Sequence, residues 1–198
     1  MNLPYRSGAA VHCADYSRRL SGVLENFEWT PVVQLADELL ECWKSGRQVF
    51  LAGNGGSGGN AIHLANDLIY ALSKRRGSGI RVHALPANAA TLTCLANDEG
   101  YDKIFSLQLA VLARPGDILV VFTGSGNSPN ILAALEEART IGMRSYAFLG
   151  FAGGKAKQLA DVPIHVAIDD MQIAEDFQLI AGHMIMQWLY THRDAVAS

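Results

Sequence analysis

One glycine-rich stretch is the main basis for the fold that we expect for this chain: Leu51-Ala52-Gly53-Asn54-Gly55-Gly56-Ser57-Gly58-Gly59. A short apolar run, residues 48–52, leads into it and is typical of a buried strand. A helix is expected after the glycines, over about residues 60–72. Glycines let the backbone approach a ligand closely, and the free N–H groups at a helix start stabilise an anion. The stretch therefore predicts a strand–turn–helix unit, which is either an anion site or a tight turn without a ligand.

Glycine spacing and composition argue against several classes of ligand. The glycines do not match G-x-G-x-x-G followed by an acidic ribose contact, and they lack the Gly-Lys-Ser/Thr of a P-loop, so a nucleotide is not favoured. The formal net charge is −3, which does not favour nucleic acid as a partner. The apolar runs fall short of the roughly 20 residues of a membrane span, so we expect no membrane association.

A second loop of similar character follows the clearest strand of the chain, residues 117–122. This loop, Thr123-Gly124-Ser125-Gly126-Asn127-Ser128, carries three hydroxyl groups and no charge. It precedes a helix expected over residues 130–141, for which Ser128 is alternatively only the N-cap. Ligands of open α/β sheets bind beyond the carboxyl ends of the strands, where both loops are expected to lie. Together the two loops predict a site for one phosphate group.

The rest of the chain alternates between strand and helix patterns. Thr30 is expected to cap a helix that has Pro31 in its first turn and ends at Gly46. The other expected helices cover residues 10–27, 91–96, 102–112 and 171–192, and the other strands cover residues 81–85, 144–149 and 162–166. Strands that alternate with helices favour a parallel sheet with helices on both faces.

Length and cysteine content are typical of one intracellular domain. The 198 residues, 49% of them hydrophobic, are expected to form a single domain, with N-terminal helices over residues 1–46 and an α/β core with a C-terminal helix over residues 47–198. Residues 1–6 do not resemble a signal peptide, so we expect a cytoplasmic protein. The three cysteines form no C-x-x-C motif, and Cys42 and Cys94 are expected to be buried thiols.

Three motifs of this sequence resemble those of a known family. Gly53-Asn54-Gly55-Gly56-Ser57 and Ser125-Gly126-Asn127-Ser128 look like the paired loops of SIS-domain (sugar isomerase) proteins. Leu95-Ala96-Asn97-Asp98-Glu99-Gly100-Tyr101, with Ile104-Phe105 soon after, resembles the phosphoheptose isomerases within that family. The resemblance covers about residues 31–190.

The resemblance implies a fold, an assembly and a reaction. The fold would be a flavodoxin-like three-layer α/β sandwich with a five-stranded parallel sheet, and the assembly a homotetramer with active sites at subunit interfaces. The reaction would convert the ketose sedoheptulose 7-phosphate into the aldose D-glycero-D-manno-heptose 7-phosphate, which feeds heptose synthesis for the bacterial cell envelope. The sugar phosphate would be bound by Asn54, Gly55, Gly56, Ser57, Asp98, Thr123, Gly124, Ser125, Ser128 and Glu175.

Four residues, Glu175 again among them, match the positions where the family has its acid–base groups and zinc ligands. Aldose–ketose isomerisation needs a base at carbon, an acid at oxygen and a group that stabilises the enediolate. His63 and Asp67 are four residues apart on one helix, and Glu175 and His183 are eight apart on another, so each pair shares a helix face. The resemblance implies Asp67 as the base and His183 as its catalytic partner. It also implies a divalent metal ion such as zinc, bound by His63, Asp67, Glu175 and His183.

Departures from the family pattern leave alternatives open. Asp67 replaces a glutamate, Glu175 replaces the usual glutamine, and Gln172 replaces a common aspartate. If Asp67 is drawn onto a metal or falls short, Glu175 would serve as the base instead. The other interpretation is that the isomerase chemistry is altered or lost. A further alternative is that His63 and His183 are helix histidines that make ordinary hydrogen bonds.

Two functions from different classes therefore remain: a phosphosugar isomerase, or a non-catalytic phosphosugar-binding adaptor for a replication initiator. A sugar-phosphate-sensing regulatory domain is disfavoured because the sequence has no basic helix-turn-helix segment.

Overall fold

Short apolar runs form a parallel sheet at the centre of the molecule. The computed structural model describes residues 8–196. Its strands are β1 (Gln48–Gly53), β2 (Arg81–Ala84), β3 (Ile118–Thr123), β4 (Arg144–Leu149) and β5 (Val162–His165). They pair in parallel in the order β2-β1-β3-β4-β5, which is the flavodoxin-like order. The prediction of a five-stranded parallel sheet is confirmed.

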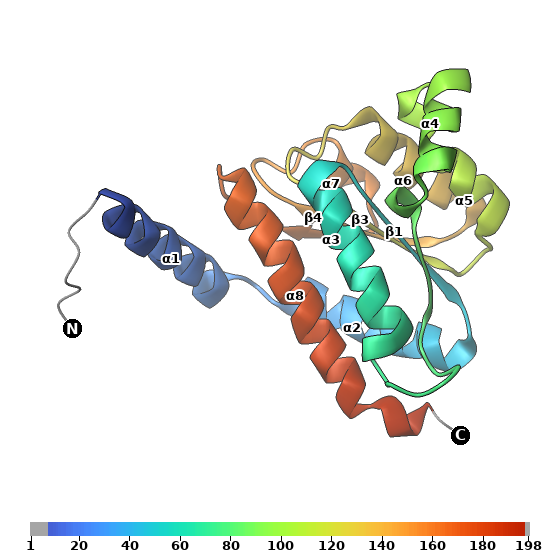
Figure 1. Ribbon diagram of the computed structural model, residues 1–198, viewed down its shortest axis with the longest axis horizontal. Coiled ribbons are helices and arrows are strands. Elements are labelled where there is room, and N and C mark those ends of the chain that lie inside the picture. The colour runs from blue at the N-terminus through green and yellow to red at the C-terminus, as the bar shows by residue number, and fades with distance from the viewer. Residues whose placement is uncertain (1–7, 197–198) are drawn as a thin grey trace.

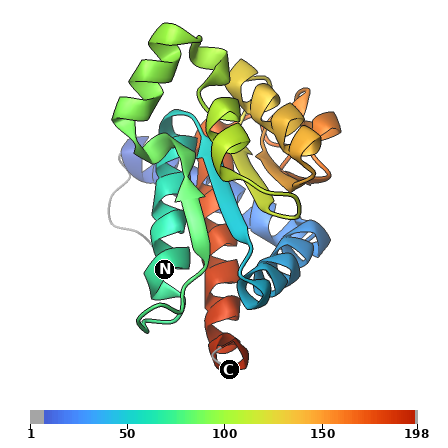
Figure 2. The ribbon, with the colours of Figure 1, turned by 90° about the vertical axis from the view of Figure 1, so that its right-hand side faces the viewer.

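Helices cover both faces of this sheet because successive side chains of each strand point to opposite sides. Val49 and Leu51 face the first layer, which contains α2 (Thr30–Ser45), α3 (Gly55–Asn66) and α8 (Met171–Thr191). Phe50 and Ala52 face the second layer, which contains α5 (Ser106–Leu112), α6 (Pro129–Ile141) and α7 (Ala156–Leu159). Figure 2 shows α3 and α8 on one side of the strands and α6 on the other. The predicted three-layer arrangement is confirmed.

The strand order brings the two glycine loops together. From β1 the chain crosses to β2 on one side, whereas from β3 it crosses to β4 on the other. This reversal is the point where ligands bind in open α/β sheets. Gly53 at the end of β1 lies opposite Phe122, one residue before the end of β3. Both loops therefore leave the same edge of the sheet from adjacent strands.

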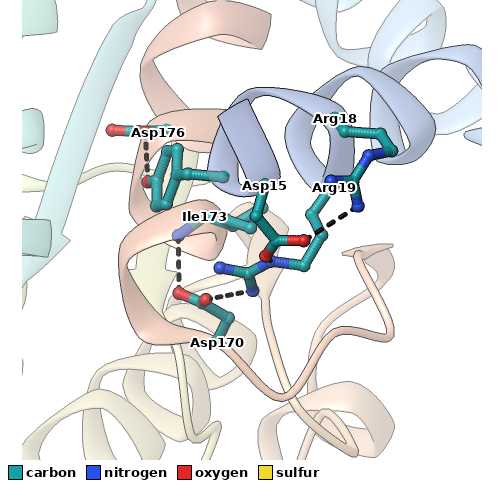
Figure 3. Close-up of polar contacts among 7 residues, drawn as sticks. Asp15, Arg18, Arg19, Asp170, Ile173 and Asp176 are labelled. Atoms are coloured by element: carbon teal, nitrogen blue, oxygen red, sulfur yellow. Dashed lines mark hydrogen bonds and ion pairs between the residues drawn. The ribbon is translucent and has the colours of Figure 1, made fainter. Parts of the chain in front are cut away.

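Helix α1 (Gly8–Asn26) extends away from these layers, and no residue within its bounds is buried (Figure 1). Tyr16 donates a hydrogen bond of 2.6 Å to Asp176, and Arg19 donates one of 2.6 Å to Asp170, which also caps the start of α8 (Figure 3). The bond from Arg19 holds the pKa of the Asp170 carboxyl below its ordinary value. This contact is therefore present at neutral pH and is lost as the pH falls through the lowered pKa.

The start of α2 differs from the sequence prediction. Thr30 does not cap the helix with its hydroxyl: the N-cap residue is Trp29, which makes no side-chain cap bond. Instead the Thr30 N–H and hydroxyl both donate to Glu28 Oε1, at 3.0 and 2.6 Å. Because Glu28 accepts both protons, the Thr30 hydroxyl is a donor here and not the acceptor that an N-cap requires. Gly46 ends the helix with a φ of 69°, as predicted.

Several other helix bounds also differ. Helix α3 begins earlier than expected because its glycines join the first turn, and it continues into a π-helical turn, Asp67–Ala71. Helix α4 spans Ala89–Asp98, and short 3-10 turns span Leu85–Ala87, Tyr101–Lys103 and Arg193–Ala195. Helix α7 was not predicted. Cys42 is buried as expected, but the prediction for Cys94 is wrong, because α4 leaves that thiol exposed.

Within residues 8–196, no helix combines the length and apolar character needed to cross a membrane. The N-terminal stretch used to predict localisation, residues 1–6, lies outside the described residues.

A buried carboxylate joins the amino ends of the two central strands. Asp117 is 3% exposed and accepts the N–H groups of Gln48 and Arg114, each at 2.8 Å. We expect Asp117→Ala to lower the free energy of unfolding by about 2–4 kcal/mol, because it leaves both N–H groups without an acceptor. Urea denaturation measures this change.

The matched control is Glu136→Ala, which removes an exposed carboxylate from α6 and is expected to change stability by less than about 0.5 kcal/mol. An Asp117→Ala protein as stable as this control would contradict the assignment.

Candidate active site

The two glycine loops open into one pocket at the carboxyl ends of β1 and β3. The pocket encloses about 350 Å³, including its open mouth. Its lining consists of Asn54, Ser57, Phe122, Thr123, Gly124, Ser125, Ser128, Met171 and Glu175. Seven of the ten residues that the sequence suggested for a sugar phosphate, Glu175 among them, are therefore brought together here.

A reciprocal amide pair joins the two loops. Asn54 Nδ2 donates to Asn130 Oδ1 and Asn130 Nδ2 donates to Asn54 Oδ1, each at 2.8 Å. The Tyr101 hydroxyl adds a bond of 3.0 Å to Asn54 Oδ1. Because Asn130 is fully buried in the first turn of α6, the pair fixes the start of α3 relative to the start of α6. Asn130 was not among the residues suggested from the sequence, and its place just after the second loop was the available clue.

The glycines and the hydroxyl groups of the second loop have different structural roles. Gly126 has a φ of 66°, and a side chain there would overlap the Gly153 carbonyl. Thr123 Oγ1 accepts the Gly126 N–H at 3.2 Å. Ser128 occupies the N-cap position of α6 but makes no side-chain cap bond. The capping role considered for Ser128 is therefore not observed, and Ser128 is one of the residues that line the pocket.

A chain of side chains from α3 and α8 orients the Ser57 hydroxyl. Buried Asn60 donates to Gln178 Oε1 at 2.9 Å, and Gln178 donates to Ser57 Oγ at 3.3 Å. Ser57 in turn donates to Glu175 Oε1 at 3.1 Å. Asn60 and Gln178 were not singled out from the sequence. Their three-residue spacing from Ser57 and Glu175, which puts each pair on one helix face, was the available clue.

The electrostatics of the pocket depend on helix ends rather than on cations. Among the described residues that line it, Glu175 is the one charged side chain and no lysine or arginine is present. The first turns of α3 and α6 both begin at the pocket and contribute backbone N–H groups and the positive ends of their dipoles. Helix starts of this kind stabilise an anion, and here no side-chain cation of the pocket lining adds to them.

A second cluster of polar side chains lies farther along α3 and α8, which run side by side in Figure 1. His63 Nε2 on α3 and His183 Nε2 on α8 are 2.9 Å apart. Asp67 is the first residue of the π-helical turn, and its Oδ2 lies 3.6 Å from each of these nitrogens. Asp67 is 9% exposed, whereas both imidazoles are about half exposed. The cluster therefore faces solvent through its histidines.

The donor set of this cluster fits a divalent metal ion. The three donor atoms all lie within 4.8 Å of one another. In a tetrahedral zinc site, with bonds of about 2.0–2.2 Å, neighbouring donor atoms are roughly 3.3–3.5 Å apart, so the observed separations need to change by only a few tenths of an ångström. Two imidazoles and a carboxylate also leave a fourth position open, as in catalytic zinc sites.

The structure does not bring every suggested residue to these two places. Glu175 lies about 12 Å along α8 from His183, eight residues at 1.5 Å each, and its carboxylate contacts Ser57 instead of the cluster. Asp98 is exposed at the end of α4, where it accepts from Asn97 Nδ2 at 2.7 Å, and it is outside the pocket lining. Gly55 and Gly56 form the first turn of α3.

Comparison with known proteins identifies the family of this chain. The family model for the SIS domain matches residues 12–150. The chain is 35% identical over 173 residues to the phosphoheptose isomerase of Burkholderia pseudomallei (strain 1710b), a match that covers 87% of each protein.

Two solved structures share the fold. A phosphoheptose isomerase from Francisella tularensis superposes with a TM-score of 0.87 at 27% identity, covering 93% of this chain and 100% of that one. A phosphoheptose isomerase from Neisseria gonorrhoeae gives a TM-score of 0.83 at 28% identity, covering 92% and 97%. Because the family model and a relative above 30% identity both cover most of the sequence, this chain belongs to the SIS-domain family, in the group of the phosphoheptose isomerases.

Proposed function

We propose that this protein is a phosphosugar isomerase that interconverts sedoheptulose 7-phosphate and D-glycero-D-manno-heptose 7-phosphate in the cytoplasm, for heptose synthesis. One observation carries the proposal: an anion pocket and a histidine–carboxylate cluster lie on the same pair of helices, α3 and α8. Ser57 and His63 are six residues apart, or about 9 Å along α3. That separation is of the same order as the length of a seven-carbon sugar, with its phosphate at one end and its carbonyl near the other.

In this proposal the phosphate binds at the starts of α3 and α6. The hydroxyls of Ser57, Ser125 and Ser128 donate to its oxygens, together with backbone N–H groups of the two first turns. The amide pair between Asn54 and Asn130 keeps the two sets of donors at a constant separation. The carbonyl end of the sugar then extends along α3 toward the histidines.

The cluster supplies the proton transfers. Conversion of the ketose removes a proton from C1, returns one at C2, and moves the O1 proton to O2. Asp67 is the proposed base at carbon, and the His183 imidazole is the proposed group that moves the proton between the oxygens. Asp67 Oδ2 lies 3.6 Å from both imidazole nitrogens, whereas Glu175 is not part of the cluster, which supports Asp67 rather than Glu175 as the base.

A divalent metal such as zinc is part of the proposal. His63, Asp67 and His183 would hold it. Because the ring nitrogen that binds a metal has no lone pair left for a proton, His183 would then move the proton through its other ring nitrogen. When bound, it would supply Lewis-acid stabilisation of the negative charge that develops on the enediolate oxygens. One oxygen of the Asp67 carboxylate is enough for a metal contact, which leaves the other for the proton.

The activity test is His183→Ala. We expect the purified protein to isomerise sedoheptulose 7-phosphate, and we expect kcat/KM of the variant to fall roughly 100-fold or more, because proton transfer at oxygen is lost. Both proteins are assayed without and with added Zn²⁺. His12→Ala, which removes an exposed imidazole from α1, is the matched control and should retain activity.

Failure of this test has a specific meaning. If the wild-type protein gives no turnover in either condition yet binds the phosphosugar tightly, the isomerase proposal is wrong. The altered residues Asp67 and Glu175 would then favour the second candidate, a non-catalytic phosphosugar-binding adaptor.

We also propose that the protein is a homo-oligomer, a tetramer by resemblance, whose subunit interface covers the histidine cluster. His63 and His183 are each next to an exposed apolar side chain, Ile62 at 43% and Met184 at 46%. Beside them, an apolar groove of about 660 Å³ runs between α2 and α8. The groove is lined by Trp29, Val32, Val33, Ala36, Asp37, Met184, Ile185 and Trp188. A second copy packed there would exclude water from the cluster.

The double change Val33→Glu and Met184→Glu tests this assembly. We expect the molar mass measured by light scattering to fall and kcat/KM to fall with it, because buried charges disfavour the interface. Val111→Glu, at a position 71% exposed on α5, is the control on a different surface. A wild-type protein that is monomeric and fully active would refute the proposal.

A further inference from the structure

The Glu175 carboxylate lies where a phosphate oxygen would be expected to bind. Glu175 Oε1 accepts the Ser57 hydroxyl at 3.1 Å. The carboxylate also packs against the first turn of α3, since a methyl group added at Gly56 would overlap both of its oxygens. An anionic group of the protein itself therefore occupies the end of the pocket formed by α3.

The Ser57 hydroxyl cannot serve Glu175 and a phosphate together. A serine hydroxyl has one proton to donate. Gln178 Nε2 donates to Ser57 Oγ, and Asn60 holds that amide in the orientation required. Because Gln178 and Asn60 are buried and bonded to each other, Ser57 is kept as an acceptor toward them. Its proton is directed to the pocket, where Glu175 now takes it.

Charge makes the competition stronger. A phosphate monoester brings up to two negative charges, and like charges a few ångströms apart repel strongly when little water separates them. Of the described side chains in the pocket lining, none is a lysine or arginine that would offset the repulsion. A phosphate at the start of α3 therefore requires the Glu175 carboxylate to move away.

We propose that Glu175 is an internal competitor for the phosphate group: it occupies the phosphate position at the first turn of α3 until a phosphosugar displaces it. The inference rests on the proposed function, since it assumes that the pocket binds phosphate. Glu175 then sets affinity without touching the reacting carbons. It weakens the binding of every phosphate ligand by the same factor, so free phosphate occupies the pocket less, while a phosphosugar has further contacts through its hydroxyls.

The test is Glu175→Gln, which keeps the shape of the side chain and removes its charge. Calorimetric titration should give a dissociation constant about 10- to 100-fold lower than that of the wild type, for sedoheptulose 7-phosphate and for inorganic phosphate alike. Unphosphorylated sedoheptulose should bind the two proteins equally. Glu136→Gln, the same change on the exposed face of α6, should leave all three affinities unchanged.

A second background separates the competition from a general charge effect. In Ser57→Ala the hydroxyl for which Glu175 competes is absent, so the gain from Glu175→Gln should become smaller than in the wild type. If Glu175→Gln binds the phosphate ligands as weakly as the wild type, or more weakly, the inference is overturned.

Failure of the proposed function gives a different result. If neither the wild type nor Glu175→Gln binds either phosphate ligand, the pocket is not a phosphate site, and both proposals fail. If both proteins bind phosphosugar with equal affinity, and Ser125→Ala weakens that binding, the phosphate site stands and only the role of Glu175 is refuted.

Discussion

Parallel pairing of β1 with β3 is the interaction on which the rest of the site depends. It sets Gly53 opposite Phe122, so that two loops distant in the sequence leave the sheet side by side. Helices α3 and α6 then begin at one place, and their free N–H groups converge. Either loop alone would offer one weak anion site. The amide pair between Asn54 and Asn130 holds the two loops at a constant separation, because each amide satisfies the other's donor and acceptor.

The second constraint is that α3 and α8 run side by side. Sequence spacing along these helices becomes distance in the site at 1.5 Å per residue. In the proposed function, Ser57 and Glu175 lie at the anion end, whereas His63, Asp67 and His183 lie at the proton-transfer end. The spacing of residues along α3 and α8 therefore determines the length of ligand that reaches from one end to the other. The loops contribute only groups that would contact its phosphate.

A pocket without cations depends on the orientation of neutral donors. Backbone N–H groups are oriented by the helices, but a hydroxyl rotates freely unless its neighbours restrain it. Buried Asn60 and Gln178 provide that restraint for Ser57. Their amides are paired with each other, so the restraint does not create an unsatisfied polar group in the interior. The presence of a carboxylate at Glu175 in such a pocket is the feature that most distinguishes this chain's electrostatics from a simple anion site.

The sequence by itself determined the sheet, the two loops and the family resemblance, because apolar runs, glycines and hydroxyls at strand ends are local patterns. It could not decide which side chains meet. Glu175 contacts Ser57 across 118 positions, and Asn130 pairs with Asn54 across 76, so these contacts exist only once the helices are packed. The start of α2 is different, because Glu28 accepts the protons of Thr30 from only two residues away and the contact is therefore local. Tertiary structure separated Glu175 from the histidine cluster because a shared helix face does not bring residues eight positions apart together.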